Sequence, residues 1–91
     1  MMKRLHIWVN GNVQGVYFRH NTARMAAVLD VRGWVRNLGD GRVEIVCEGD
    51  DEALEEMLDW SRHGPTGASV EGIEIEWEEY TGEFNGFRID H

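Results

Sequence analysis

Two residues in the first half of the chain have the chemistry to handle a small anion, Arg19 and Asn37. Arg19 ends the run Gly11–Arg19, in which Gly11 and Gly15 predict a tight turn between a strand and a helix. Backbone N–H groups of such a turn, with the free N–H groups of the following helix, can converge on one anion. A guanidinium adds two parallel hydrogen bonds to a phosphate or carboxylate. The run therefore predicts a small oxyanion or phosphoryl site.

The glycine spacing excludes two common phosphate-binding motifs. No Lys-Ser or Lys-Thr follows a G-x-x-x-x-G spacing, and Gly11 and Gly15 do not form G-x-G-x-x-G. Glycines between a strand and a helix also serve simply to make a turn, and a surface arginine is usually solvated. The run by itself thus leaves a purely structural role open.

Asn37 ends a second informative segment, Gly33-Trp34-Val35-Arg36-Asn37. In a strand, alternation places Gly33, Val35 and Asn37 on one face. An asparagine near a strand end can also cap a turn, which is the structural alternative. Because the segment begins soon after the first predicted helix, it can lie beside the glycine turn. An amide both donates and accepts hydrogen bonds, as positioning a water molecule requires.

The elements around these residues follow from hydrophobic periodicity and turn residues. Alternation predicts strands and i, i+3, i+4 spacing predicts helices. Asp-Gly predicts a two-residue hairpin turn within Gly39-Asp40-Gly41, Asp50 or Asp51 suits a helix N-cap, and Gly64-Pro65 suits a helix end. Val70 and Ile73 differ in parity, which predicts a bulge or the strand start at Gly72. The predicted order is strand 5–9, helix 20–29, strand 31–37, strand 42–48, a helix up to Gly64, a strand at 73–78 and a short strand at 87–89.

This order predicts an α+β fold of the ferredoxin-like sandwich type, βαββαβ with a short C-terminal strand. Two helices would pack on one face of an antiparallel sheet. Glutamates that alternate with Ile73, Ile75 and Trp77 fit a sheet whose other face meets water. The fold alone does not identify a function, since it carries many unrelated activities.

Length and composition limit the function classes. Ninety-one residues predict one domain, residues 1–91, and the single cysteine, Cys47, lies in an alternating run that favours a packed thiol over a nucleophile. No apolar run is long enough for a membrane span and no signal segment is present, so we expect a cytoplasmic protein without membrane partners. Residues 43–91 carry fifteen acidic and two basic side chains, which disfavours nucleic acid as a partner. Residues 1–42, with seven basic and two acidic side chains, contain the predicted anion site.

With these motifs together, the chain resembles the acylphosphatase family over nearly its whole length. The resemblance rests on Gly11–Arg19 and Gly33–Asn37, and continues through Asp40-Gly41-x-Val43, Gly49, Trp60, Gly64-Pro65, Ala68, Val70 and Phe87-x-Ile89. It implies a ferredoxin-like enzyme that hydrolyses the carboxyl-phosphate bond of acyl phosphates to a carboxylate and inorganic phosphate. It also implies that neither a metal nor another cofactor is needed.

The resemblance assigns roles to the motif residues. Arg19 would bind the phosphoryl group and Asn37 would hold the attacking water. The phosphoryl oxygens would also receive backbone N–H groups from Asn12, Val13, Gln14, Gly15, Val16, Tyr17, Phe18 and Arg19. Asp30, where the family often has a helix-ending glycine, and Leu38, where a small hydroxyl residue is common, depart from the pattern.

The partners expected are a small acyl phosphate and its product phosphate, and the simplest oligomeric state is a monomer. Absence of a cysteine, histidine and carboxylate cluster with metal-ligand spacing agrees with a metal-free site, and absence of a nucleophile paired with a base favours direct attack by water. The alternative is a non-catalytic module on the same fold that binds a small anion or a partner. Such a module would keep Arg19 but would not need Asn37 beside it.

Overall fold

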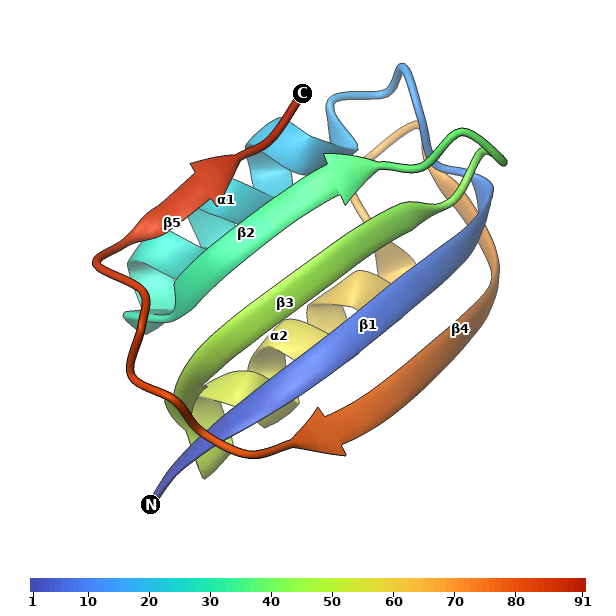
Figure 1. Cartoon of the computed structure of the whole chain (residues 1–91). Coiled ribbons are helices and arrows are strands. Elements are labelled where there is room, and N and C mark those ends of the chain that lie inside the picture. The colour runs from blue at the N-terminus through green and yellow to red at the C-terminus, as the bar shows by residue number, and fades with distance from the viewer.

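The computed structural model describes residues 1–91 as two layers, a five-stranded sheet with two helices on one of its faces (Figure 1). The elements are β1 (Met2–Asn12), α1 (Phe18–Leu29), β2 (Arg32–Asn37), β3 (Val43–Asp50), α2 (Asp51–His63), β4 (Ser69–Glu78) and β5 (Phe87–Ile89). The predicted ferredoxin-like order is confirmed. Neither helix is long and apolar enough to cross a membrane.

The strand order is β4-β1-β3-β2-β5, and the sheet is mixed rather than wholly antiparallel. The first four strands pair antiparallel as predicted, whereas β5 pairs parallel to β2 through Gly33↔Phe87 to Val35↔Ile89. The direction of β5 follows from residues 79–86, which cross from β4 at one edge of the sheet to β2 near the other (Figure 1). This crossing carries the end of the chain to the start of α1.

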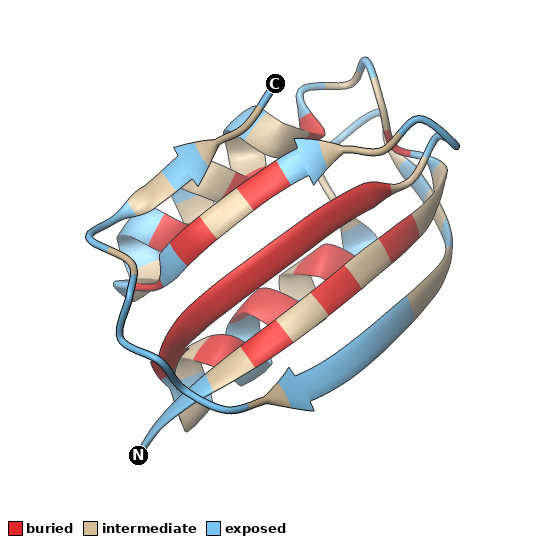
Figure 2. Cartoon of the chain, viewed as in Figure 1, coloured by how far each residue is buried: buried red, intermediate tan, exposed pale blue.

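The core lies between the sheet and the helices. Leu5, Ile7 and Val9 of β1 are fully buried and alternate with partly exposed residues. Figure 2 shows that β3, in contrast, is buried almost along its whole length. Cys47 faces the core, where burial raises the pKa of its thiol to about 12. The prediction of a packed thiol is therefore confirmed.

The open face of β3 is buried because charged side chains of its neighbours close over it. Glu44 of β3 accepts hydrogen bonds from His6 Nε2 (2.7 Å) and Arg36 Nε (2.6 Å). Burial by itself would raise the pKa of Glu44, but these two hydrogen bonds outweigh burial and lower the pKa below its ordinary value. The other ring nitrogen of His6 lies 3.0 Å from an oxygen of Glu78, and this contact, together with Arg4, lowers the pKa of Glu78. The polar groups on this face thus satisfy one another.

Two turns differ from the sequence prediction. The β2–β3 turn has three residues, not two, because Leu38 N–H donates to the Arg42 carbonyl and Gly41 N–H donates to the Leu38 carbonyl. Only Gly41 (φ +96°) adopts a positive φ there, so Asp40 keeps an ordinary conformation. Gly11 belongs to β1 rather than to the following turn. It faces Val70 where the β1–β4 register shifts, and a Cβ on Gly11 would lie 2.1 Å from the Ser69 carbonyl oxygen. This register shift places Glu71 as the extra residue and confirms the predicted bulge beside Gly72.

The helix ends are set largely as expected. Helix α2 has Asp50 at its N-cap position, although the Asp50 side chain makes no capping hydrogen bond, and it ends at Gly64. Helix α1 begins at Phe18, two residues earlier than predicted, and ends at Leu29. Asp30 caps it in the left-handed conformation (φ +56°) that favours glycine, and its N–H bonds the carbonyls of Ala26 and Ala27. Aspartate therefore occupies a backbone conformation at the end of α1 that glycine would adopt without strain.

Candidate active site

The segment from residue 13 to residue 17 connects β1 to α1 and turns its backbone N–H groups away from the protein's own acceptors. None of these N–H groups donates a backbone hydrogen bond, and the first N–H bond of α1 runs from Asn21 to the Tyr17 carbonyl. The first N–H groups of the helix are free as well, as helix geometry requires. Gly15 (φ +75°) and Tyr17 (φ +60°) are both left-handed, which gives the loop the alternating curvature typical of an anion-binding nest.

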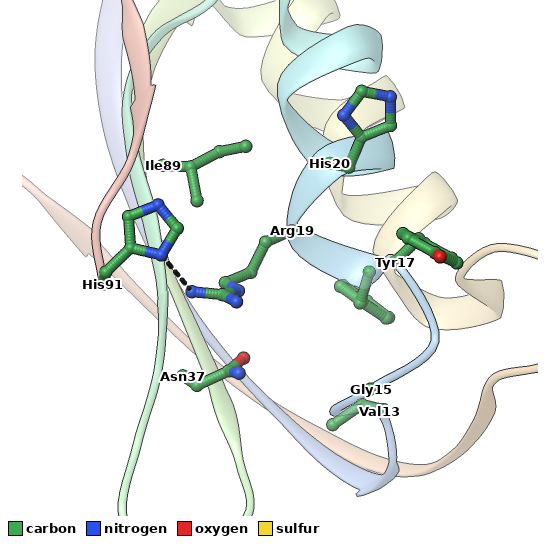
Figure 3. Close-up of a pocket in the computed structure, with 9 residues that line it drawn as sticks. Val13, Gly15, Tyr17, Arg19, His20, Asn37, Ile89 and His91 are labelled. Carbon is green, nitrogen blue, oxygen red and sulfur yellow. Dashed lines mark hydrogen bonds between the residues drawn. The ribbon is translucent and has the colours of Figure 1, made fainter.

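A cavity of about 400 Å³ opens beside this loop (Figure 3). Its walls come from the loop, the first turn of α1, the end of β2 and the end of β5. The lining residues are Val13, Gly15, Tyr17, Phe18, Arg19, His20, Asn37, Ile89 and His91. The lining therefore includes an arginine and two histidines but no carboxylate, although the chain as a whole is strongly acidic.

Arg19 presents one edge of its guanidinium to this cavity. Its Nη1 donates to the Asp90 carbonyl (3.2 Å) and to Nδ1 of His91 (3.3 Å), so that both Nη1 protons are occupied. Nε and Nη2 make no hydrogen bond within the protein. These two nitrogens form the fork that binds two oxygens of one anion. The segment around β5 thus fixes one end of the guanidinium and leaves the other free.

Asn37 is the last residue of β2 and lines the same cavity as Arg19, and Figure 3 shows its amide pointing toward the guanidinium. Its Oδ1 is buried and has no hydrogen-bond partner. A buried polar atom without a partner is costly, by about 1–3 kcal/mol, unless a water or a ligand satisfies it. The Asn37 side chain lines the cavity, and its amide can both donate and accept hydrogen bonds, as an oriented water molecule requires.

Gln14 ties the loop to the β2–β3 hairpin. Its Nε2 donates to the Leu38 carbonyl (2.8 Å) and to the Arg42 carbonyl (3.0 Å). Leu38 directly follows Asn37, so these two bonds fix the asparagine relative to the loop of residues 13–17. The resemblance predicted only a backbone N–H role for Gln14, because nothing in the sequence indicates which carbonyls its side chain would contact.

The structure places the remaining predicted residues as follows. Val13, Gly15, Tyr17 and Phe18 line the cavity with Arg19. The other three do not line it; Asn12 lies at the end of β1 opposite Ser69, and Gln14 and Val16 lie in the loop. Sequence analysis missed Ile89 and His91, because their position depends on the crossing of residues 79–86. His20, which also lines the cavity, lies in the first turn of α1.

The two-layer α+β domain brings a free arginine edge, free loop N–H groups and the Asn37 side chain to one cavity, an arrangement suited to a small anion. Comparison with known proteins identifies the family to which the chain belongs. A model of the acylphosphatase family matches residues 5–89. The chain is 52% identical over 89 residues to an acylphosphatase from Pyrobaculum arsenaticum, an alignment that covers 97% of this chain and 94% of the relative. It is also 51% identical over 86 residues to an acylphosphatase from Pelotomaculum thermopropionicum, covering 94% of each chain.

Solved structures agree with these relatives. A crystal structure of acylphosphatase from Bacillus subtilis superposes with a TM-score of 0.94 at 33% identity and covers both chains fully. An acylphosphatase from Coxiella burnetii gives a TM-score of 0.92 at 32% identity, over 98% of this chain and 93% of that chain. The chain belongs to the acylphosphatase family. It is an enzyme, a hydrolase that cleaves acyl phosphates, and the alternative of a non-catalytic module is not favoured.

Proposed function

We propose that this enzyme hydrolyses its acyl phosphate by direct attack of a water held by Asn37 on a phosphoryl group held by Arg19 and by the backbone N–H groups of residues 12–19. The observation that carries the proposal is that Arg19, whose Nε and Nη2 are free, and Asn37, whose Oδ1 has no partner, line one cavity. Of the predicted N–H donors, those of residues 13–17 have the strongest support, because none donates a backbone hydrogen bond.

The chemistry follows from the charges. The water oxygen attacks phosphorus opposite the acyl oxygen, the P–O bond to the acyl group breaks, and its electron pair leaves on the carboxylate. The proton released by the attacking water passes to solvent, and the products are a carboxylate and inorganic phosphate. A carboxylate is a good leaving group, so no strong acid has to protonate it, and catalysis rests on positioning and charge stabilisation.

Arg19 and the N–H groups supply that stabilisation as preorganised donors to the phosphoryl oxygens, and we propose that the reaction needs neither metal nor cofactor. The substrate is a small molecule, since the cavity of about 400 Å³ is the size of a small-ligand site. We further propose that residues 1–91 act as one domain and as a monomer in the cytoplasm, with no nucleic acid partner. The acidic charge of residues 43–91 supports the last point.

The division of roles is tested with benzoyl phosphate in the presence of a chelator. Arg19→Ala should lower kcat/KM by about 10²-fold or more and should also abolish inhibition by inorganic phosphate, because the fork is lost. Asn37→Ala should lower kcat comparably but leave phosphate inhibition nearly unchanged. Arg24→Ala, the same charge change on an exposed part of α1 outside the cavity, is the matched control and should behave like the wild type.

Circular dichroism and a thermal melt would confirm that each variant is folded. Turnover close to the wild-type value in a folded Arg19→Ala protein would refute the role of the arginine. Equal loss of phosphate inhibition in the Asn37 and Arg19 variants would refute the separation of water placement from anion binding. Activity that disappears with the chelator and returns with a divalent cation would refute metal independence.

A further inference from the structure

Phe18 is the first residue of α1 and comes directly before Arg19, and its ring is buried. The side chain is 1% exposed, belongs to the hydrophobic core and also forms part of the cavity wall. Its ring packs on Trp60 near the end of α2, with the two ring centroids 5.4 Å apart. The buried hydroxyl of Thr22 donates to the Phe18 carbonyl (2.7 Å). Because the N-cap Tyr17 makes no capping bond through its side chain, packing of the Phe18 ring takes a larger part in holding the start of α1.

The Phe18 ring has no room to move toward the end of α2. Gly64, the residue after that helix, lies so close that a Cβ on it would be 2.8 Å from Cε2 of Phe18. The same Cβ would lie 3.2 Å from the Cβ of Ala68, so an added methyl group could not move away from the ring. Ordinary contacts begin at 3.4 Å, so relief of the 2.8 Å contact displaces the ring by at least about 0.6 Å. Because the ring forms part of the cavity wall, the free space open to it is the cavity.

We propose that Gly64 is a positioning residue for the phosphoryl site, because the absence of a side chain there lets Phe18 lie deep enough to place the first turn of α1. This inference rests on the proposed roles of Arg19 and of the N–H groups of residues 12–19. The first turn carries the N–H groups of Phe18 and Arg19 and the base of the arginine side chain. Displacement of the ring therefore moves these donors relative to the anion, whereas Asn37 on β2 keeps its place. Gly64 does not line the cavity and acts only through Phe18.

The test compares two glycines that have the same kind of backbone conformation but different surroundings. Gly64 (φ +70°) and Gly67 (φ +96°) both adopt a positive φ, whereas a Cβ on Gly67 would meet no atom within 4 Å. A misplacement of about 1 Å can cost about 10²-fold in rate, so Gly64→Ala should lower kcat/KM for benzoyl phosphate about tenfold. The inhibition constant of inorganic phosphate should rise by a similar factor. Gly67→Ala, the matched control, strains the backbone in the same way and should change both constants less than twofold, at temperatures well below each Tm.

Phe18→Leu supplies the compensating change. Leucine is shorter than phenylalanine and leaves space beside Gly64. Gly64→Ala should therefore cost less than twofold in kcat/KM when it is made in a Phe18→Leu protein. Two residues that act independently would show additive effects, so this cycle separates contact with Phe18 from a general loss of stability.

Several results would overturn the inference. A tenfold loss that also occurs in Gly67→Ala, or that persists in the Phe18→Leu protein, would assign the effect to backbone strain. Wild-type kcat/KM in a folded Gly64→Ala protein would exclude any positioning role. If Gly64→Ala does not fold, Trp60→Leu removes the packing partner of Phe18 without straining the backbone and should change both constants in the same direction. Unchanged constants in that variant, measured beside the exposed Trp77→Leu as control, would also overturn the inference.

Arg19→Ala separates this failure from failure of the proposed site. If phosphate inhibits Arg19→Ala as strongly as the wild type, the anion is not held by Arg19 and both proposals fall. If inhibition depends on Arg19 but not on Gly64, only the present inference falls.

Discussion

The Gln14 side chain offers a sharp test of how the site is assembled, because it touches no part of the proposed reaction. Gln14→Glu keeps the shape of the side chain but replaces both Nε2 donors by a carboxylate oxygen. The two bonds to the Leu38 and Arg42 carbonyls (2.8 and 3.0 Å) are then lost. Each carbonyl keeps one backbone partner, since Gly41 N–H donates to Leu38 and Leu38 N–H donates to Arg42. Neither carbonyl is therefore left wholly unsatisfied.

The magnitude follows from this geometry. Two hydrogen bonds worth about 0.5–1.5 kcal/mol each give a loss of about 2 kcal/mol in the free energy of unfolding. For a domain of this size, such a loss lowers Tm by about 8–16 °C. Activity should fall further than stability suggests, because Asn37 lies next to Leu38 and a displacement of about 1 Å can cost about 10²-fold in rate. We expect kcat for benzoyl phosphate to drop roughly 10–100-fold in both Gln14→Glu and the uncharged Gln14→Ala. The phosphate inhibition constant of Gln14→Ala, which adds no charge to the loop, should change less than threefold.

Gln14→Glu would be measured beside Gln14→Ala, which removes the same bonds without adding a charge. Steady-state kinetics well below both melting temperatures, with urea denaturation in parallel, separate catalysis from unfolding. The reasoning is wrong if both variants keep wild-type kcat and Tm. It is also wrong if they lose phosphate binding as strongly as Arg19→Ala, because the side chain would then act through the anion site and not through the hairpin.

Two further predictions concern stability. Asp30→Gly should raise the free energy of unfolding by about 1 kcal/mol, because glycine adopts the left-handed conformation at this helix end (φ +56°) without strain. A thermal melt checks this prediction, and an unchanged or lower Tm would contradict it. The pKa values of Glu44 and Glu78 are lowered in the folded protein and return toward the ordinary 4.5 when the chain unfolds. In mildly acidic solution the unfolded chain therefore binds more protons than the folded protein does. The free energy of unfolding should therefore fall as the pH drops below about 4.5, and urea denaturation at pH 7 and pH 3.5 should show a smaller fall in Glu44→Gln than in the wild type.

The parts of the fold that the sequence predicted are those set by local pattern. Leu5, Ile7 and Val9 alternate because one face of β1 packs on the helices, and Gly64 ends α2 with a positive φ (+70°) that other residues rarely adopt. The bulge beside Gly72 was visible because a change of parity within one strand has no other simple cause. Helix α1 began earlier than predicted, since Tyr17 is a left-handed N-cap without a capping side chain. No residue type at that position signals such a start.

The rest depends on contacts between distant segments. Arg19 and Asn37 were identified from their own motifs, but the anchors of Arg19 come from Asp90 and His91, more than seventy residues away. The direction of β5 could not be derived from its three residues, because it depends on the crossing of residues 79–86. The pairing of His6 with Glu44 and Glu78 has the same origin, since it forms only when β1 lies between β3 and β4.

The parallel strand β5 has a consequence for how the enzyme loses activity on heating. It is a three-residue edge strand, joined to β2 over Gly33 to Val35 and by the flanking bonds Gly33 N–H to Gly86 and Asp90 N–H to Val35. Short edge strands open locally at a much lower free energy than a whole domain unfolds. Detachment of β5 would release Asp90 and His91 and leave the guanidinium of Arg19 unanchored, while the antiparallel strands β1 to β4 stay folded. We therefore expect the guanidinium of Arg19 to lose its orientation at a temperature below that at which the molecule melts.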